Sequence, residues 1–180
     1  MRYIAALSVL ASLVVMTFFA EHLTTLGLSY DGRLVNLAGA QRMLSQKVTK
    51  DAERIAAAHE MRDIETEKDA IRMIQEDLDR FVKAHHALKN RDGTFELRGK
   101  NSEQINQRFE ILDPQLDLII ESAGELLEAI EADDFEKEMH ALQNLRWAES
   151  IFLPTMDETV DMYEAESLMH TRTIELVSLA

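Results

Sequence analysis

Apolar residues recur every three or four positions through most of the chain, which is the spacing of one buried face of an α-helix. A first run follows Asp31 and is interrupted once by a polar residue; it comprises Leu34, Leu37, Gln41, Leu44, Val48 and Ile55. A second run comprises Ile64, Ile71, Ile74, Leu78, Phe81, His85 and Leu88. The turn-forming residues Asn90–Gly93 follow it, so we expect the second helix to end near Lys89.

The third run is the most regular in the chain, and it comprises Ile105, Phe109, Leu112, Leu116, Ile119, Ala123, Leu126 and Ile130. After Asp133 and Asp134, a fourth run comprises Phe135, Met139, Leu142, Leu145, Phe152, Met156, Val160, Tyr163, Ile174 and Val177. Pro114 and Pro154 fall inside these last two runs, where we expect them to bend the helices.

The fold class that follows is all-α. Only 6 of the 180 residues are Gly and 2 are Pro, as is typical of long helices. Four helices joined by short connections predict an up-down-up-down antiparallel four-helix bundle, with the end of the last helix returning to the side where the first begins.

An N-terminal transmembrane helix is predicted in front of the bundle. Tyr3–Ala20 carries no charged side chain and approaches the roughly 20 residues that cross a bilayer. Arg2 before it and Glu21 after it orient the amino end toward the cytoplasm. We therefore expect an anchor at 1–20 in the bacterial inner membrane, a periplasmic sensor bundle at 21–175, and the start of a second membrane segment at 176–180. A cleaved signal peptide is the alternative, but Phe18 is too bulky for that cleavage site.

Charge and composition exclude several classes of function. A net charge of −14 with no basic stripe opposes nucleic acid as a partner. The absence of cysteine removes thiolate and haem-attachment sites. Because the sequence has no glycine-rich phosphate loop and no activated nucleophile, we expect neither an enzyme nor a bound cofactor.

Metal binding has weak support in the sequence. Di-iron bundles use Glu-x-x-His, in which the two side chains lie three residues apart, and no histidine here has that partner. Two pairs four residues apart, Glu136 with His140 and Glu166 with His170, arise readily by chance on acidic helices. His85 lies on the apolar face of its helix, where a core histidine is more common than a ligand. We expect no metal site.

The stretch Asn36–Gln46 places small and polar residues where a plain bundle helix would carry aliphatic ones. Beside the buried face runs a second row with 4/3 spacing, the polar stripe, which comprises Val35, Gly39, Arg42, Gln46 and Thr49. Gly39 would admit a neighbouring helix, and Arg42 offers donors shaped for a planar oxyanion. If two copies met along this stripe, a homodimer would bring two Arg42 guanidiniums together, and a small anion between them would relieve their repulsion. The alternative is that Arg42 pairs with a surface carboxylate of its own chain.

The segment Asn36–Lys47 (NLAGAQRMLSQK) resembles the signature of PilJ-type and NarX-like sensor domains. Leu153–Asp157 and Tyr163–Glu166 are similar to the start of the last helix of those domains, so the resemblance spans roughly residues 20–175. It implies an extracytoplasmic four-helix bundle attached to a signalling receptor. From the nitrate- and nitrite-sensing members it also implies that Arg42 and Gly39 bind the anion at a dimer interface. Ala40 and Lys47 stand where many members carry Arg, which leaves the ligand open.

The sequence therefore predicts the sensor module of a membrane-bound receptor, with nitrate or nitrite as the first ligand to test. We expect Arg42 and Gly39 to bind it, and Val35, Gln46 and Thr49 to support the site and the homodimer interface. The alternatives are a sensor of the same fold for another ligand or a protein partner, an anchored scaffold of the cell envelope, and a metal or haem carrier.

Overall fold

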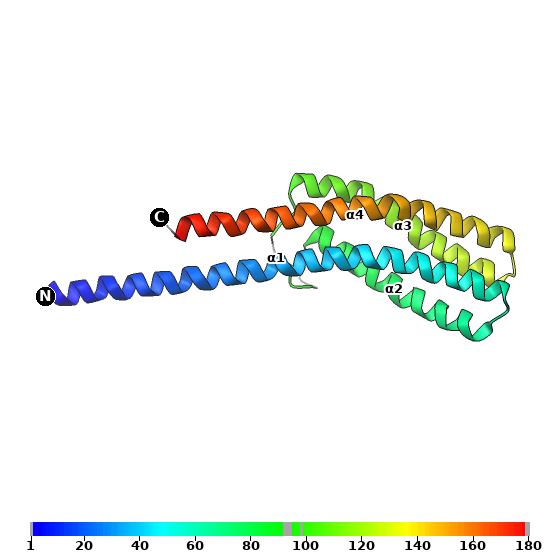
Figure 1. Cartoon of the computed structure of the whole chain (residues 1–180), viewed down its shortest axis with the longest axis horizontal. Helices are drawn as coiled ribbons and strands as arrows, with labels where there is room; N and C mark the ends of the chain where they lie inside the picture. The colour runs from blue at the N-terminus through cyan, green and yellow to red at the C-terminus, as the bar shows by residue number, and fades with distance from the viewer. Residues whose placement is uncertain (1, 92–94, 98, 179–180) are drawn as a thin grey trace.

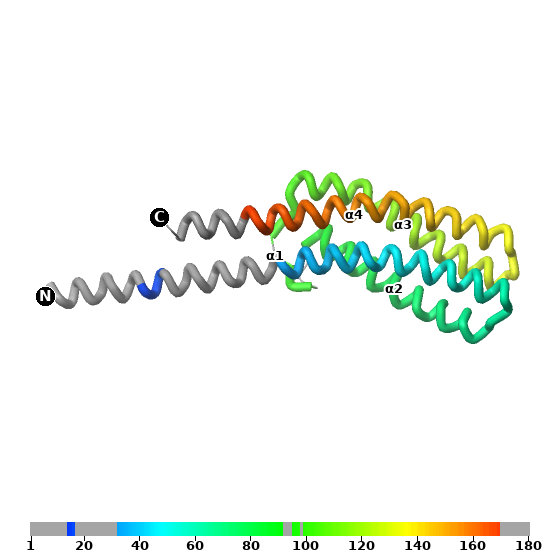
Figure 2. Tube along the Cα trace, viewed as in Figure 1, coloured from blue at the N-terminus to red at the C-terminus, as the bar shows by residue number. Residues whose placement is uncertain are grey.

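Four helices make up the computed structural model, which describes the backbone of residues 2–91, 95–97 and 99–178. Side chains are described for residues 14–16, 32–91, 95–97 and 99–169 (Figure 2). The helices are α1 (Arg2–Glu60), α2 (Ile64–Asn90), α3 (Glu103–Glu131) and α4 (Phe135–Ser178). The described residues contain no strand, so the predicted all-α class is confirmed.

Each helix runs antiparallel to the helix that follows it. Helix α1 packs against both α2 and α4, and α3 packs against α4, whereas α2 and α3 meet only over a short stretch (Figure 1). Residue numbers rise along α1 as their ion-pair partners fall along α4, in the pairs Arg42–Asp157, Glu53–Arg146 and His59–Glu138. The turns between α1 and α2 and between α3 and α4 therefore lie at one end of the bundle, which we call the tip (Figure 1).

The predicted buried faces meet in one core. All eight residues of the third run are buried, as are Leu34, Gln41 and Ile55 of the first and Phe81 and His85 of the second. Ile64 of the second run is 62% exposed at the first position of α2, so its predicted burial is wrong. Phe135 and Met139 were also predicted to be core residues, and that prediction is wrong because they are 65% and 38% exposed. They lie in the first turns of α4 at the tip, where α1 ends at Glu60 and offers no further apolar surface.

Local signals fix where the helices begin. Asp63 caps α2 by accepting the backbone N–H of Thr66, and Ser102 caps α3 by accepting that of Ile105. Each cap satisfies a backbone donor that the first helical turn leaves without a partner. Pro114 and Pro154 lie inside α3 and α4, and both helices continue through them.

Asn101 closes the end of the bundle opposite the tip. Its side-chain amide donates to the backbone carbonyls of Leu88 and Lys89 at the end of α2, at 2.9 and 3.1 Å. Its side-chain oxygen accepts from Arg91 at 2.6 Å and from the Tyr163 hydroxyl at 3.0 Å. One side chain thus joins the connection after α2 to the buried Tyr163 of α4.

The predicted anchor at 1–20 and the predicted second segment at 176–180 lie, apart from Val14–Met16, outside the residues whose side chains are described. Among the described residues, no helix has both the length and the apolar run that a membrane crossing needs.

Candidate functional site

The polar stripe divides into two rows on α1. Val35, Arg42 and Thr49, spaced seven residues apart, lie toward α4, since Arg42 reaches Asp157 on that helix. Val35 packs against the core of its own bundle, and the Thr49 hydroxyl donates to the Ser45 carbonyl at 3.2 Å. Gly39 and Gln46 form the second row, and Gln46 is exposed. Arg42 is exposed as well and Gly39 is half-buried with open space beside it, so the stripe presents Gln46, Gly39 and, at their edge, Arg42 to solvent.

Arg42 forms an ion pair with Asp157 of α4, through Nε and Oδ1. Both side chains remain about half exposed, at 51% and 43%. The sequence left open whether Arg42 pairs with a carboxylate of its own chain, and the structure places one there. Sequence reasoning missed Asp157, although the position lies in the Leu153–Asp157 run, because finding it requires the register of α4 against α1.

Gly39 lies one turn before Arg42 and has open space where a side chain would begin. A Cβ added at this glycine would meet no heavy atom within 4 Å. No neighbouring helix in the described part of the chain therefore needs the glycine. Because no neighbouring helix of the described chain fills the space beside Gly39, that space is free for the close approach of a second molecule.

Polar side chains replace aliphatic ones in the core beside Arg42 and Asp157. Gln41, Ser45, Thr155 and Thr159 are all buried. Ser45 bonds to the Arg42 carbonyl, and Thr155 and Thr159 bond to carbonyls one turn back on α4. Neither polar atom of the Gln41 amide has a hydrogen-bond partner among the described residues. A buried amide without a partner costs free energy relative to an apolar side chain of the same shape.

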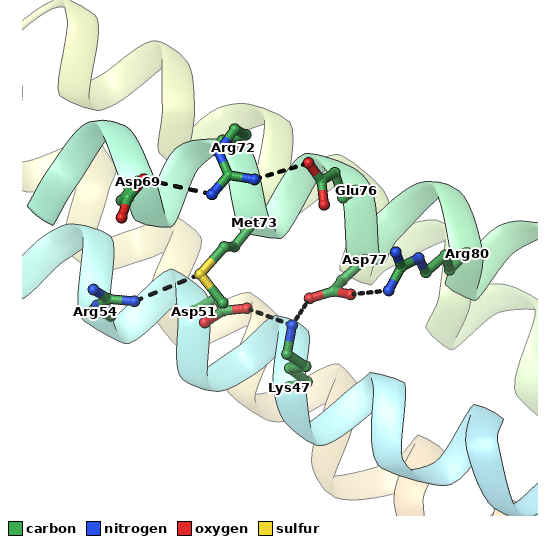
Figure 3. A network of polar contacts seen from close by, with 9 residues as sticks. All are labelled: Lys47, Asp51, Arg54, Asp69, Arg72, Met73, Glu76, Asp77 and Arg80. Atoms are coloured by element: carbon green, nitrogen blue, oxygen red, sulfur yellow. Dashed lines mark hydrogen bonds and ion pairs between the residues drawn. The ribbon is translucent and has the colours of Figure 1, made fainter.

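Lys47 is the last residue of the motif Asn36–Lys47, and its side chain links α1 to α2. Its ammonium lies between two carboxylates, Asp77 of α2 and, at 3.7 Å, Asp51 of α1 (Figure 3). The side chains of Asp77 and Asp51 are 3% and 8% exposed, and Arg80 approaches Asp77 at 3.8 Å. This network was not predicted from the sequence. The available signal was Asp77 itself, an acid placed three residues after Ile74 on the apolar face of α2.

Burial and pairing shift the ionisation of this network in a consistent way. The hydrogen bond to Asp77 raises the pKa of Lys47, so the ammonium stays charged. Burial raises the pKa of Asp51, because a carboxylate away from water is costly, and Lys47 opposes that shift. One cation thus supports two buried acids, and the contact between α1 and α2 depends on it.

His85 of α2 is hydrogen-bonded to Asp113 of α3 and is a core histidine, as predicted. It is 1% exposed, its Nε2 lies 2.8 Å from Asp113 Oδ1, and its ring stands edge-on to Phe109. Burial lowers the pKa of His85 and outweighs the opposing effect of Asp113. Burial alone would raise the pKa of Asp113, but hydrogen bonds from His85 and Lys89 outweigh it and lower that pKa. The pair is therefore a neutral imidazole that donates to a carboxylate.

We expect the free energy of unfolding to fall as the pH drops below about 6.5, the ordinary pKa of histidine. In that range the unfolded chain binds a proton at His85 while the folded chain, with its lowered pKa, does not, so acid favours unfolding. Urea unfolding of the wild type and of His85→Gln between pH 5 and 7 measures the difference. The variant should show a shallower pH dependence, and equal slopes would contradict a neutral, buried His85.

The residues considered for metal binding lie apart from the polar stripe. Glu136 and His140 line an open pocket of about 580 Å³ at the tip, together with Glu125, Glu128, Asp134 and Lys137. His140 Nδ1 lies 3.3 Å from the Asn144 side-chain amide. Among the residues described, no three potential ligands come together as a metal ion would require. The side chain of His170, the partner of Glu166, lies outside the described residues.

The structure defines a class of protein, an all-α helical bundle with a polar stripe on its first helix. Comparison with known families identifies the family to which the chain belongs. Residues 24–132 match the PilJ family, described as the N-terminal region of the type IV pili methyl-accepting chemotaxis transducer. The match covers more than half of the chain, which therefore belongs to the PilJ family, as its motif predicted. No curated protein and no solved structure matched the chain.

Membership fixes the general role of this chain. PilJ domains are non-catalytic sensor or transducer modules of chemotaxis receptors, which are membrane proteins. The matched residues contain the polar stripe, Lys47 and the His85–Asp113 hydrogen bond between α2 and α3. The Leu153–Asp157 run, with Asp157, lies outside them.

Proposed function

We propose that this PilJ module senses a small planar oxyanion, nitrate or nitrite first, at Arg42 between two copies of the chain. The observation that carries the proposal is the position of Arg42, a half-exposed guanidinium at the edge of the open row of Gly39 and Gln46. An arginine offers five N–H donors in a fixed plane, and a flat oxyanion can accept two of them at once.

A second copy of the chain would supply the second guanidinium of the proposed site. A single exposed guanidinium holds a monovalent anion weakly in water, because screening leaves little net attraction. Two α1 helices approaching along Gly39 would place two guanidiniums around one anion and exclude water from it. Their mutual repulsion without the anion, and its relief with the anion, would make the dimer arrangement depend on the ligand. Residues 1–20 would anchor the module so that the bundle samples the periplasm.

The experiment is a symmetric crosslink along the proposed interface. The chain has no cysteine, so Gln46→Cys introduces a single thiol on the exposed row. Oxidation of the full chain in membranes should give a disulfide-linked dimer, and nitrate should change its yield. Asp69→Cys is the matched control, since that site is equally solvent-facing but lies on α2.

Equal dimer yields at the two positions would contradict the interface. A specific crosslink at position 46 that no anion alters would keep the dimer and refute the oxyanion as its ligand. That second result would favour a PilJ sensor for another ligand or for a protein partner.

A further inference from the structure

Two ion pairs join α1 to α4, and they are almost equally exposed. Arg42 pairs with Asp157 at 51% and 43% exposure, and Arg146 pairs with Glu53 at 2.8 Å with 51% and 44% exposure. They differ in position. The first pair uses the arginine of the motif, and the second lies about three helical turns nearer the tip.

A carboxylate and a planar oxyanion compete for the same donors. Both present two oxygen acceptors in a plane, and both match the guanidinium fork. Because Asp157 is attached to α4, it reaches Arg42 without the loss of translational freedom that a dissolved anion incurs. Asp157 occupies the Nε edge of the Arg42 guanidinium, so an anion that accepts two hydrogen bonds from that same edge must displace this carboxylate.

The surroundings of the Arg42–Asp157 pair keep the free-energy cost of that displacement small. The core beside the pair holds the polar residues Gln41, Ser45, Thr155 and Thr159 as well as apolar Leu44 and Met156, and the Gln41 amide has no partner among the described residues. Pro154 lies one turn before Asp157 and leaves the backbone of α4 one hydrogen bond short. The hydroxyls of Ser45, Thr155 and Thr159 bond to carbonyls of their own helices, so the polar contact between α1 and α4 at this level is the exposed Arg42–Asp157 pair.

From these observations we propose that Asp157 is an intramolecular competitor for the anion at Arg42: it occupies the guanidinium when no ligand is bound and is released when an oxyanion binds. This inference rests on the proposed function of Arg42. It adds a regulatory carboxylate that sets the affinity of the site, and it makes the α1–α4 contact depend on the ligand. Asp157 lies on α4, which runs antiparallel to α1 from the tip past Arg42 (Figure 1).

Competition has a thermodynamic signature that a direct contact lacks. A competitor weakens every anion by one common factor, because the same Arg42–Asp157 pair must open whichever anion binds. An exposed ion pair corresponds to a factor of about two to five in an equilibrium constant. Two such pairs open when one anion binds between two copies, so Asp157→Asn should tighten nitrate and nitrite by about four- to 25-fold, and by equal factors.

Calorimetric titration of nitrate and nitrite into the purified full chain tests this. Wild type, Asp157→Asn and two controls would be compared at one ionic strength. Glu53→Gln removes the matched ion pair of α1 with α4, and Glu158→Gln removes the same charge one residue away, where Glu158 pairs with Arg108 at 3.0 Å. The expected result is tighter binding in Asp157→Asn alone, with both controls within a factor of about 1.5 of wild type.

Each other outcome has a definite meaning. Unchanged or weaker binding in Asp157→Asn, or equal gains in the controls, overturns the competitor while the anion site itself stands. Binding that appears only in Asp157→Asn supports the competitor in its strongest form. If neither wild type nor Asp157→Asn binds either anion, the proposed function fails and the competitor fails with it.

Discussion

Replacing Lys47 by Met should destabilise the bundle by about 3 kcal/mol, although the methionine keeps most of the packing volume of the lysine stem. The substitution leaves the carboxylates of Asp51 and Asp77, which are 8% and 3% exposed, without their shared cation. Removal of one partner from a buried ion pair typically costs about 3–5 kcal/mol, and the partial exposure of Lys47 places this case at the low end. Urea unfolding of the full chain measures the loss.

Lys83→Met provides the matched control on α2. Lys83 pairs with Asp79 at 2.6 Å, but both side chains are about 60% exposed, so the same substitution should cost less than about 0.5 kcal/mol. If the two variants lose equal stability, Lys47 is screened by water and does not fasten α1 to α2.

The loss in Lys47→Met should shrink in acid. Burial raises the pKa of Asp51 in the folded chain, so the folded state binds a proton at this carboxyl before the unfolded state does. Unfolding then becomes less favourable as the pH falls through that raised pKa, because protonation removes the uncompensated buried charge. A second change, Asp77→Leu, should recover much of the loss at neutral pH, since an apolar pair of similar volume is tolerated where a lone charge is not.

Replacing Arg42 by Ala should weaken anion binding by at least about a hundredfold. In the proposed dimer each copy contributes one arginine, and each charge-assisted hydrogen bond is worth about 1.5–3 kcal/mol. Two such losses exceed about 2.8 kcal/mol, and every 1.4 kcal/mol is a factor of ten in affinity. The fold should survive, because the pair with Asp157 is half exposed and contributes about 1 kcal/mol or less.

Arg42→Lys separates charge from shape. Lysine keeps the positive charge but loses the planar fork, so it should bind nitrate measurably less tightly than arginine does. Equal affinity of the two proteins would mean that the site attracts any anion by charge alone and does not recognise a flat one.

Helical periodicity was enough to predict the secondary structure and most of the core. The run from Ile105 to Ile130 is buried at every position, and Gln41 is buried even though it is polar, because spacing alone places it inside. Periodicity failed at the tip, at Ile64, Phe135 and Met139, where the pattern continues past the point at which a neighbouring helix ends. A repeat along one helix carries no information about where its partners stop.

Only those residues of the candidate site that lie on one helix could be predicted from the sequence, because a pattern along one helix does not reveal its partners on the others. The motif singles out Arg42 and Gly39 within one helix, and local spacing suffices for that. Asp157 and Asp77 lie 115 and 30 residues away from their partners Arg42 and Lys47, so their roles depend on the register between helices. Register is set by packing of the whole core, and a reading of one helix at a time does not supply it.

The central claim, that Arg42 is the anion-binding residue of this PilJ module, is tested most directly by one calorimetric comparison. Nitrate would be titrated into the full chain as wild type and as Arg42→Ala, with helicity and the urea midpoint confirming that both are folded. We expect measurable binding by the wild type and at least about a hundredfold weaker binding by the variant. Nitrate binding of equal strength in the two proteins would contradict the site.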